Sequence, residues 1–302
     1  MSKIKITLAI AASYFIFAIL LNSVGTVILQ AINTLGVSKT EASVLEGFKD
    51  LSIAIMSFVV ASFIPRLGYK LAMLLALIVV AIACLSTAVI SDFYMFKVLF
   101  AAVGCGFAVV KVSVYSIIGQ VTEDANSHSS LLNTIEGIFM VGVLSGYWVF
   151  TAFIDPVDSN AWLNVYYVLA ALTLLVIISV VIAPIKPAIK GQKSNSGWSD
   201  FIAMLKLTYQ PLVLIFIISA FLYVLIEQGV GTWLPTFNNQ VLQLPVAISI
   251  QLASIFAAAL ALGRLVAGQV LKHIHWFVVL SCCLVAMAAL IIITVTTNGK
   301  LT

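Results

Sequence analysis

The stretch Leu71–Ser91, LAMLLALIVVAIACLSTAVIS, contains 21 consecutive residues without a charged side chain. A helix needs about 20 apolar residues to cross the hydrocarbon core of a bilayer, and this stretch meets that length. The composition of the whole chain agrees, because 63% of its 302 residues are hydrophobic and 9% are charged. Soluble domains carry about 25% charged residues. The sequence therefore predicts a membrane protein.

Similar apolar stretches recur along the chain and predict an all-α, polytopic bundle of about nine transmembrane helices. The candidate spans are residues 6–31, 42–64, 71–91, 93–119, 130–154, 163–184, 211–237, 246–270 and 275–297. The first span follows two lysines, but it is too long for the apolar region of a signal peptide. We therefore interpret it as a retained helix.

Basic residues in the loops predict the orientation of the chain. If the N-terminus is cytoplasmic, nine basic loop residues face inward and three face outward, as the positive-inside rule requires. The inner residues are Lys3, Lys5, Arg66, Lys70, Lys186, Lys190, Lys193, Lys206 and Lys272, and the outer ones are Lys39, Lys97 and Lys300. We expect a multi-pass protein of the inner cell membrane. The net charge of +4 comes from basic residues that set the membrane orientation, so it does not indicate binding of nucleic acid.

The sequence contains no motif typical of an enzyme. It has no glycine loop for a nucleotide, no metal-binding pair on a helix and no nucleophile with a paired base. The four cysteines lie in apolar spans without metal-ligand spacing. We expect a protein that is not an enzyme and that has no cofactor and no metal.

Charged residues inside the apolar spans are the main functional signal. They are Glu46, Lys49, Asp50, Lys111, Glu136 and Glu227. An ionisable group at membrane depth is costly unless it is paired or faces a wet cavity, so such groups mark transport paths or structural ion pairs. The first three are spaced i, i+3 and i+4 and share one helix face.

Counting residues predicts the depth of the remaining charges. Lys111 and Glu136 lie equally far from the turn between their spans, so an ion pair between them is plausible. Glu227 lies near the middle of its span, has no basic residue within four positions, and precedes Gly229 and Gly231. We expect the helix to open locally at these glycines.

An uncharged polar face is also predicted on the first span, from Asn22, Thr26 and Gln30, which are spaced by four residues. Such a face suits hydroxyl-rich or amide-bearing solutes. Each of these features has a structural alternative. The ion pair could only brace two helices, the charges of span two could form a structural or gating network, and the polar face could only pack against other helices.

The second half of the chain repeats features of the first. Val24-Gly25-Thr26 recurs as Val230-Gly231-Thr232 at an offset of 206 residues, and the loop Ala61–Lys70 (ASFIPRLGYK) is followed at nearly the same offset by Gly268–His275 (GQVLKHIH). This pattern predicts a duplicated helical unit. We expect a six-helix bundle at 1–185, a cytoplasmic linker at 186–210 and a partial three-helix bundle at 211–302.

At these residues the chain resembles the major facilitator superfamily, whose loop pattern is Gly-x-Leu-Ala-Asp-Arg-x-Gly-Arg-Arg. Arg66, Gly68 and Lys70 match this pattern, whereas Pro65 replaces the aspartate. The resemblance implies two six-helix halves and a gating role for these residues together with Arg264. Loss of the acid puts the usual salt-bridge gate in question.

Further residues resemble the fucose-permease-like branch of sugar:proton symporters. They are Gly263-Arg264 with Gly268, the stretch Glu227–Trp233, and Leu132-Asn133 with Gly142 and Gly146. Helices ten to twelve of that family would require about 100 more residues. We expect a C-terminally truncated carrier.

These observations predict a secondary active transporter of a small polar solute, such as a sugar or another metabolite, coupled to protons by alternating access. Desolvation favours the neutral form of a buried acid and a nearby cation favours its charged form, so Glu227, Asp50 or Glu46 is a candidate proton carrier. The expected partners are a small-molecule solute, protons and the lipid bilayer, and a monomer is expected. The alternatives are a drug or metabolite exporter of the same superfamily and a non-functional truncated carrier.

Overall fold

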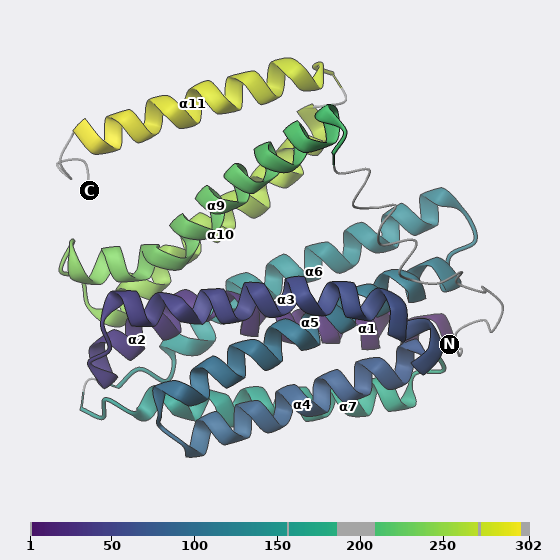
Figure 1. Cartoon of the computed structure of the whole chain (residues 1–302), viewed down its shortest axis with the longest axis horizontal. Coiled ribbons are helices and arrows are strands. Elements are labelled where there is room, and N and C mark those ends of the chain that lie inside the picture. The colour runs from purple at the N-terminus through teal and green to yellow at the C-terminus, as the bar shows by residue number, and fades with distance from the viewer. Residues whose placement is uncertain (1, 156, 186–208, 271–272, 297–302) are drawn as a thin grey trace. The chain divides into compact units, whose positions relative to one another are not determined.

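The structure is a computed structural model that describes residues 2–155, 157–185, 209–270 and 273–296 (Figure 1). Within the helices, only the backbone is described for residues 2, 61–63, 65–66, 264–265, 268–269 and 294–295. In these ranges the chain forms helices and connections, without a strand. The helices are α1 (Ser2–Asn22), α2 (Val24–Leu35), α3 (Lys39–Leu67), α4 (Tyr69–Val89), α5 (Phe93–Val121), α6 (Ala125–Thr151), η1 (Ala161–Asn164), α7 (Val165–Ile182), α9 (Pro211–Gln240), α10 (Val246–Val270) and α11 (Trp276–Thr296).

The predicted spans are confirmed as helices. By length and composition, eight segments of the described chain can cross a membrane, with α1 and α2 counted together as Lys3–Leu35. The 29-residue helix α3 is also long enough, and it carries the charges predicted at Glu46, Lys49 and Asp50. The linker expected at 186–210 lies almost entirely outside the described residues.

Local sequence explains where several helices begin and end. Gly36 has φ of 67° and ends α2, and Gly68 has φ of 87° between α3 and α4, a backbone region that favours glycine. Ser38 and Glu41 form a capping box at the start of α3. Asp92 and Asp124 cap α5 and α6 by accepting backbone N–H groups through their side chains.

Two details differ from the sequence-based expectation. The first span is broken at Ser23, whose hydroxyl donates to the Leu20 carbonyl at 2.7 Å. The opening expected at Gly229 and Gly231 is wrong, because α9 is helical through both glycines and through Pro235. A continuous helix satisfies its own backbone groups, which an opened segment in lipid cannot do.

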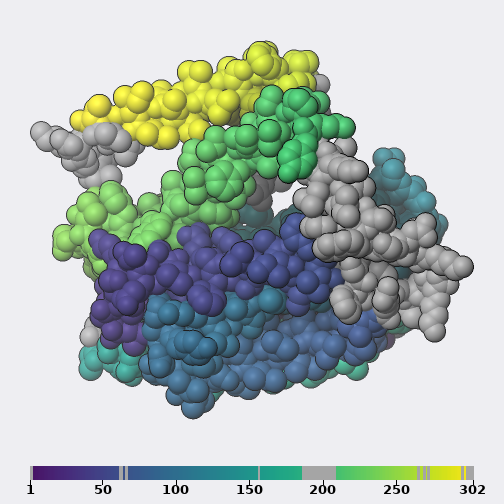
Figure 2. All heavy atoms as spheres, in the orientation of Figure 1, coloured from purple at the N-terminus to yellow at the C-terminus, as the bar shows by residue number. Residues whose placement is uncertain are grey.

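The described helices group into two compact units, Met1–Ile255 and Phe256–Thr302. In the first unit, α5 packs between α3 and α4, α1 packs on α6 and α7, and α2 contacts α9. Figure 2 shows the atoms of α3, α4 and α5 as a closely packed surface. The aromatic core of this unit includes Phe96 stacked on Trp162, with ring centroids 5.4 Å apart, beside the fully buried Tyr166. The second unit contains the C-terminal part of α10 and α11.

Candidate functional site

Three charged residues on α3 form the first part of the candidate site. Glu46 is half-buried and its Oε1 accepts a hydrogen bond from the Thr232 hydroxyl of α9 at 2.8 Å. Lys49 is 4% exposed, and its Nζ lies 3.4 Å from Oδ1 of Asp50, whose side chain is 51% exposed. The acid at position 46 therefore faces α9, while the lysine one turn later is paired within its own helix.

Small residues allow the backbones around this cluster to approach closely. A Cβ atom built on Gly25 of α2 would lie 2.5 Å from the carbonyl oxygen of Thr232. On α5, a Cβ atom on Gly104 would collide with the carbonyl oxygen of Lys49. Glycine at these two positions lets α2 reach α9 and lets α5 reach α3, as small residues do in membrane helix packing.

The contact between α2 and α9 follows the sequence repeat. Near the end of α2, the Asn33 amide donates to Oδ1 of Asn239 at 3.2 Å, and these two residues are 206 positions apart. This is the offset that relates Val24-Gly25-Thr26 to Val230-Gly231-Thr232. Corresponding residues of the two repeats therefore face each other, as expected when a duplicated unit packs around an approximate two-fold axis.

A second polar cluster connects α5 and α6. The Tyr115 hydroxyl donates to Oε1 of Glu136 at 2.8 Å. The ammonium of Lys111 lies 5.7 Å from the centre of the Phe107 ring and 5.9 Å from that of Tyr115. The ion pair expected between Lys111 and Glu136 is absent from these described residues, and both side chains contact Tyr115 instead. The lysine instead makes cation–π contacts, which are favourable where water is scarce.

The remaining predicted site residues belong to neither of these two polar clusters. Asn22 donates to the Ala18 carbonyl at 2.9 Å next to the break between α1 and α2, so its amide is used within the helix. Thr26 and Gln30 are buried in α2, with 2% and 4% exposure. Glu227 is half-buried on α9, about one and a half turns before Thr232.

The predicted gating loop is only partly described. Gly68, with its positive φ of 87°, forms the turn between α3 and α4. Lys70 donates to the carbonyl oxygens of Val181 and Ala183, at 2.8 Å each, and so satisfies the C-terminal end of α7. The side chains of Arg66 and Arg264 lie outside the described part of the chain.

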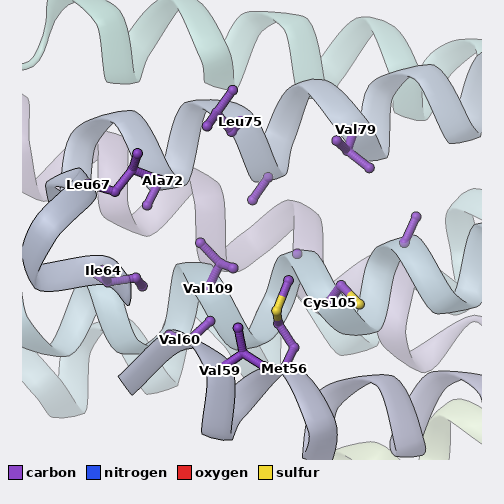
Figure 3. Close-up of a pocket in the computed structure, with 13 residues that line it drawn as sticks. Met56, Val59, Val60, Ile64, Leu67, Ala72, Leu75, Val79, Cys105 and Val109 are labelled. Atoms are coloured by element: carbon purple, nitrogen blue, oxygen red, sulfur yellow. The ribbon is translucent and has the colours of Figure 1, made fainter. Parts of the chain in front are cut away.

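An apolar cavity of about 270 Å³ lies between α3, α4 and α5 (Figure 3). Met56, Val60, Ala72, Leu75 and Val109 are among its lining residues, and none of the described side chains that line it is charged. Because it offers no polar group that would orient a polar solute, we do not assign it to the candidate site.

The cluster around Glu46 places a carboxyl group at a contact between the two repeats. The sequence identified Glu46, Lys49 and Asp50 but not Thr232 as a partner. The 206-residue offset was the available signal, because it places Thr232 in the repeat of Thr26. Tyr115 was likewise not assigned as the partner of Glu136, although it lies four residues after Lys111 on the same helix face.

The helical bundle and its charged interior define a polytopic membrane protein with polar groups between helices. Residues 10–301 match the model of the Major Facilitator Superfamily. The chain belongs to this superfamily and has its transporter fold. A search of curated proteins finds no match.

Several solved transporter structures are similar to the chain. A variant of the nucleoside transporter NupG is 17% identical, with a TM-score of 0.68 over 88% of this chain and 68% of that chain. A D-xylose-proton symporter is 14% identical, with a TM-score of 0.64 over 90% of this chain and 70% of that chain. The peptide transporter POT in complex with alafosfalin is 12% identical, with a TM-score of 0.58 over 88% and 68%. At these identities the likeness shows the fold.

Proposed function

We propose that this protein is a secondary active transporter that moves a small polar solute together with protons by alternating access. The observation that carries the proposal is the 2.8 Å hydrogen bond between Glu46 of α3 and Thr232 of α9. It joins the bundle expected at 1–185 to the segment expected at 211–302. A change in the protonation of an acid at such a contact can change how the two halves pack against each other.

Protonation changes what Glu46 can do at this contact. The ionised carboxylate accepts hydrogen bonds at both oxygens, whereas the protonated form is neutral and gains an O–H donor. Hydrogen bonds to charged groups are stronger than those between neutral groups. Proton binding would therefore weaken the hold of Glu46 on Thr232, and proton release would restore it.

The proposed solute is a sugar or a nucleoside-like metabolite. Two structurally similar proteins are a D-xylose-proton symporter and a nucleoside transporter. In this chain, the uncharged buried side chains of Thr26 and Gln30 suit hydroxyl-rich solutes. We further propose uptake across the inner membrane by a monomer with a cytoplasmic N-terminus, and retain the fucose-permease-like branch as our prediction.

Transport in proteoliposomes tests this function. Labelled D-xylose and uridine begin a panel of sugars and nucleosides, and an inward proton gradient is imposed. The wild-type protein should accumulate one of these solutes against its gradient. Glu46→Gln keeps a hydrogen-bond acceptor but cannot titrate, so it should retain downhill exchange and lose pH-driven accumulation by about 10-fold or more.

The matched control is Glu41→Gln on the same helix, because glutamine also completes a capping box. This variant should accumulate solute as the wild type does. Unchanged accumulation by Glu46→Gln would contradict the proposed coupling role. In the same assay, Glu227→Gln and Asp50→Asn test whether these residues also carry the coupled proton. If a variant accumulates solute as the wild type does, the substituted residue has no role in proton coupling.

A further inference from the structure

A second cavity, with a polar lining, lies at the C-terminal end of α2. Its volume is about 400 Å³, within the range of small-molecule sites. It is lined by the last turns of α2, the connection between α6 and α7, and the residues around the start of α10. The polar side chains among its lining residues are Gln30, Asn33, Thr34, Asp155, Asp158, Ser159 and Trp162. Unlike the apolar cavity between α3 and α4, it can orient a polar solute.

One buried polar atom among the lining residues lacks a hydrogen-bond partner in the described structure, namely the indole nitrogen of Trp162. The Gln30 side chain also lines the cavity and is 4% exposed. Leaving a buried donor unsatisfied is costly, so a ligand that offers an acceptor to Trp162 and hydrogen bonds to Gln30 would be stabilised.

The charged residues that line the cavity indicate the charge of the ligand that it would bind. Asp155 and Asp158 each use Oδ1 to accept backbone N–H groups of their own loop, from Val157 at 2.7 Å and from Asn160 at 2.9 Å. Each thus has a second carboxylate oxygen that makes no hydrogen bond with the described residues. None of the lining residues within the described part of the chain is basic. The cavity therefore favours a cation and opposes an anion.

We propose that this cavity is a binding site for a small solute that carries an ammonium group and several hydroxyl groups. The ammonium lies between the carboxylates of Asp155 and Asp158, and the hydroxyl groups bond to Gln30 and Trp162. Glu46 and Thr232 are not among the described residues that line this cavity. Gln30 also belongs to the polar face proposed for the transported solute, but Asp155, Asp158 and Trp162 do not. The site therefore goes beyond the proposed transport activity, and binding there does not require that activity.

Equilibrium binding to the purified full chain in lipid nanodiscs tests the site. The protein contains five tryptophans and is labelled with 5-fluorotryptophan. The fluorine resonance that disappears in Trp162→Phe reports on the cavity. Three probes of similar size and different charge are titrated, namely glucosamine, glucose and glucuronate. Glucosamine should shift the Trp162 resonance in a saturable way, glucose should bind about 10-fold more weakly, and glucuronate should not bind.

Two variants connect the response to the named residues. Asp155→Asn with Asp158→Asn preserves the turns, since asparagine accepts the same backbone N–H groups, but should weaken glucosamine binding by about 10-fold or more. Gln30→Met should weaken binding of glucosamine and glucose alike. Asp92→Asn, which keeps the cap of α5 outside the cavity, is the matched control and should bind as the wild type does.

Several results would contradict the proposed binding site. They are equal responses to the three probes, no response to any probe, unaltered glucosamine binding by the double aspartate variant, or a response to calcium chloride alone. Failure of pH-driven transport in proteoliposomes would overturn the proposed function and leave this binding result standing. Absence of glucosamine binding together with intact pH-driven transport would overturn the proposed site and leave the proposed function standing.

Discussion

Gly25 of α2 meets the backbone of Thr232 of α9, the residue that follows Gly231, its counterpart in the second repeat. A Cβ atom on Gly25 would lie only 2.5 Å from the Thr232 carbonyl oxygen. The hydroxyl of the same threonine donates to Glu46. Thr232 therefore takes part both in the close approach to α2 and in the hydrogen bond to the acid.

The first prediction concerns Gly25→Ala. The added methyl group meets backbone oxygen and not a flexible side chain, so α2 and α9 must separate. Overpacking of this kind costs about 1–3 kcal/mol. We expect a lower midpoint of thermal unfolding and solute accumulation reduced by about 10-fold, measured in detergent and in proteoliposomes respectively.

Gly229→Ala is the control for this substitution. Gly229 lies on α9, and nothing is within 4 Å of the position of its Cβ atom. Alanine in an open helical position should be neutral or stabilising by about 0.5–1 kcal/mol. If Gly25→Ala behaves like Gly229→Ala, the two helices do not approach as closely as described.

The second prediction concerns the coupling between Glu46 and Thr232. A double-mutant cycle with Glu46→Leu and Thr232→Val should give a coupling free energy of about 0.5–1.5 kcal/mol, because both single variants remove the same hydrogen bond. Reversible unfolding in mixed micelles measures it. Strictly additive effects would mean that the hydrogen bond does not stabilise the protein.

The third prediction concerns Tyr115 and Glu136. Tyr115→Phe removes the donor to the Glu136 carboxylate and should destabilise the protein by about 1 kcal/mol. Lys111→Met should have a separate effect, since Lys111 contacts the rings of Phe107 and Tyr115 and not Glu136. Chemical unfolding in the same micelles distinguishes them. A larger loss from Lys111→Met in the presence of Glu136 than in Glu136→Gln would indicate the direct ion pair instead.

The fourth prediction concerns pH and the first turn of α6. The backbone N–H and hydroxyl of Ser127 donate to Asp124 and lower the pKa of its carboxyl below the ordinary 3.8. Because the folded-state pKa is lowered, the cap stabilises the helix at pH above 3.8 and is lost as pH falls through the lowered value. Backbone amides of this turn should therefore exchange faster at low pH than intrinsic rates explain.

Asp124→Asn is the comparison for this experiment, since asparagine caps a helix without titrating. Hydrogen exchange read by mass spectrometry on the peptide that begins at Ala125 should lose its excess pH dependence in this variant. An unchanged pH profile would assign the effect to another group, such as Glu123, which pairs with Lys3 at 2.9 Å.

Hydropathy alone predicted the helices, because only a helix of about 20 apolar residues satisfies its backbone groups in lipid. Depth along a helix was also predictable, and Lys111 and Glu136 do both lie beside Tyr115. Side-chain partners were not, because they depend on how each helix is rotated about its axis. Depth counting cannot tell whether a lysine reaches a carboxylate or an aromatic ring.

The candidate site shows the same limit. The spacing of Glu46, Lys49 and Asp50 predicted a shared face, but not that Glu46 would bond to α9 while Lys49 pairs with Asp50. The cavity at Asp155 and Asp158 gave no signal in the spans, because these aspartates lie in a loop. Its polar lining combines segments far apart in the sequence.

Cross-linking of α2 to α9 tests alternating access most directly. Asn33 and Asn239 are hydrogen-bonded through their side chains at 3.2 Å, so a short reducible bis-methanethiosulfonate reagent should link Asn33→Cys to Asn239→Cys. The four native cysteines are replaced by alanine, and the same background without the pair is the control. We predict that the cross-link stops solute uptake in proteoliposomes and that reduction restores it. Undiminished uptake with the cross-link confirmed by mass spectrometry would contradict the account.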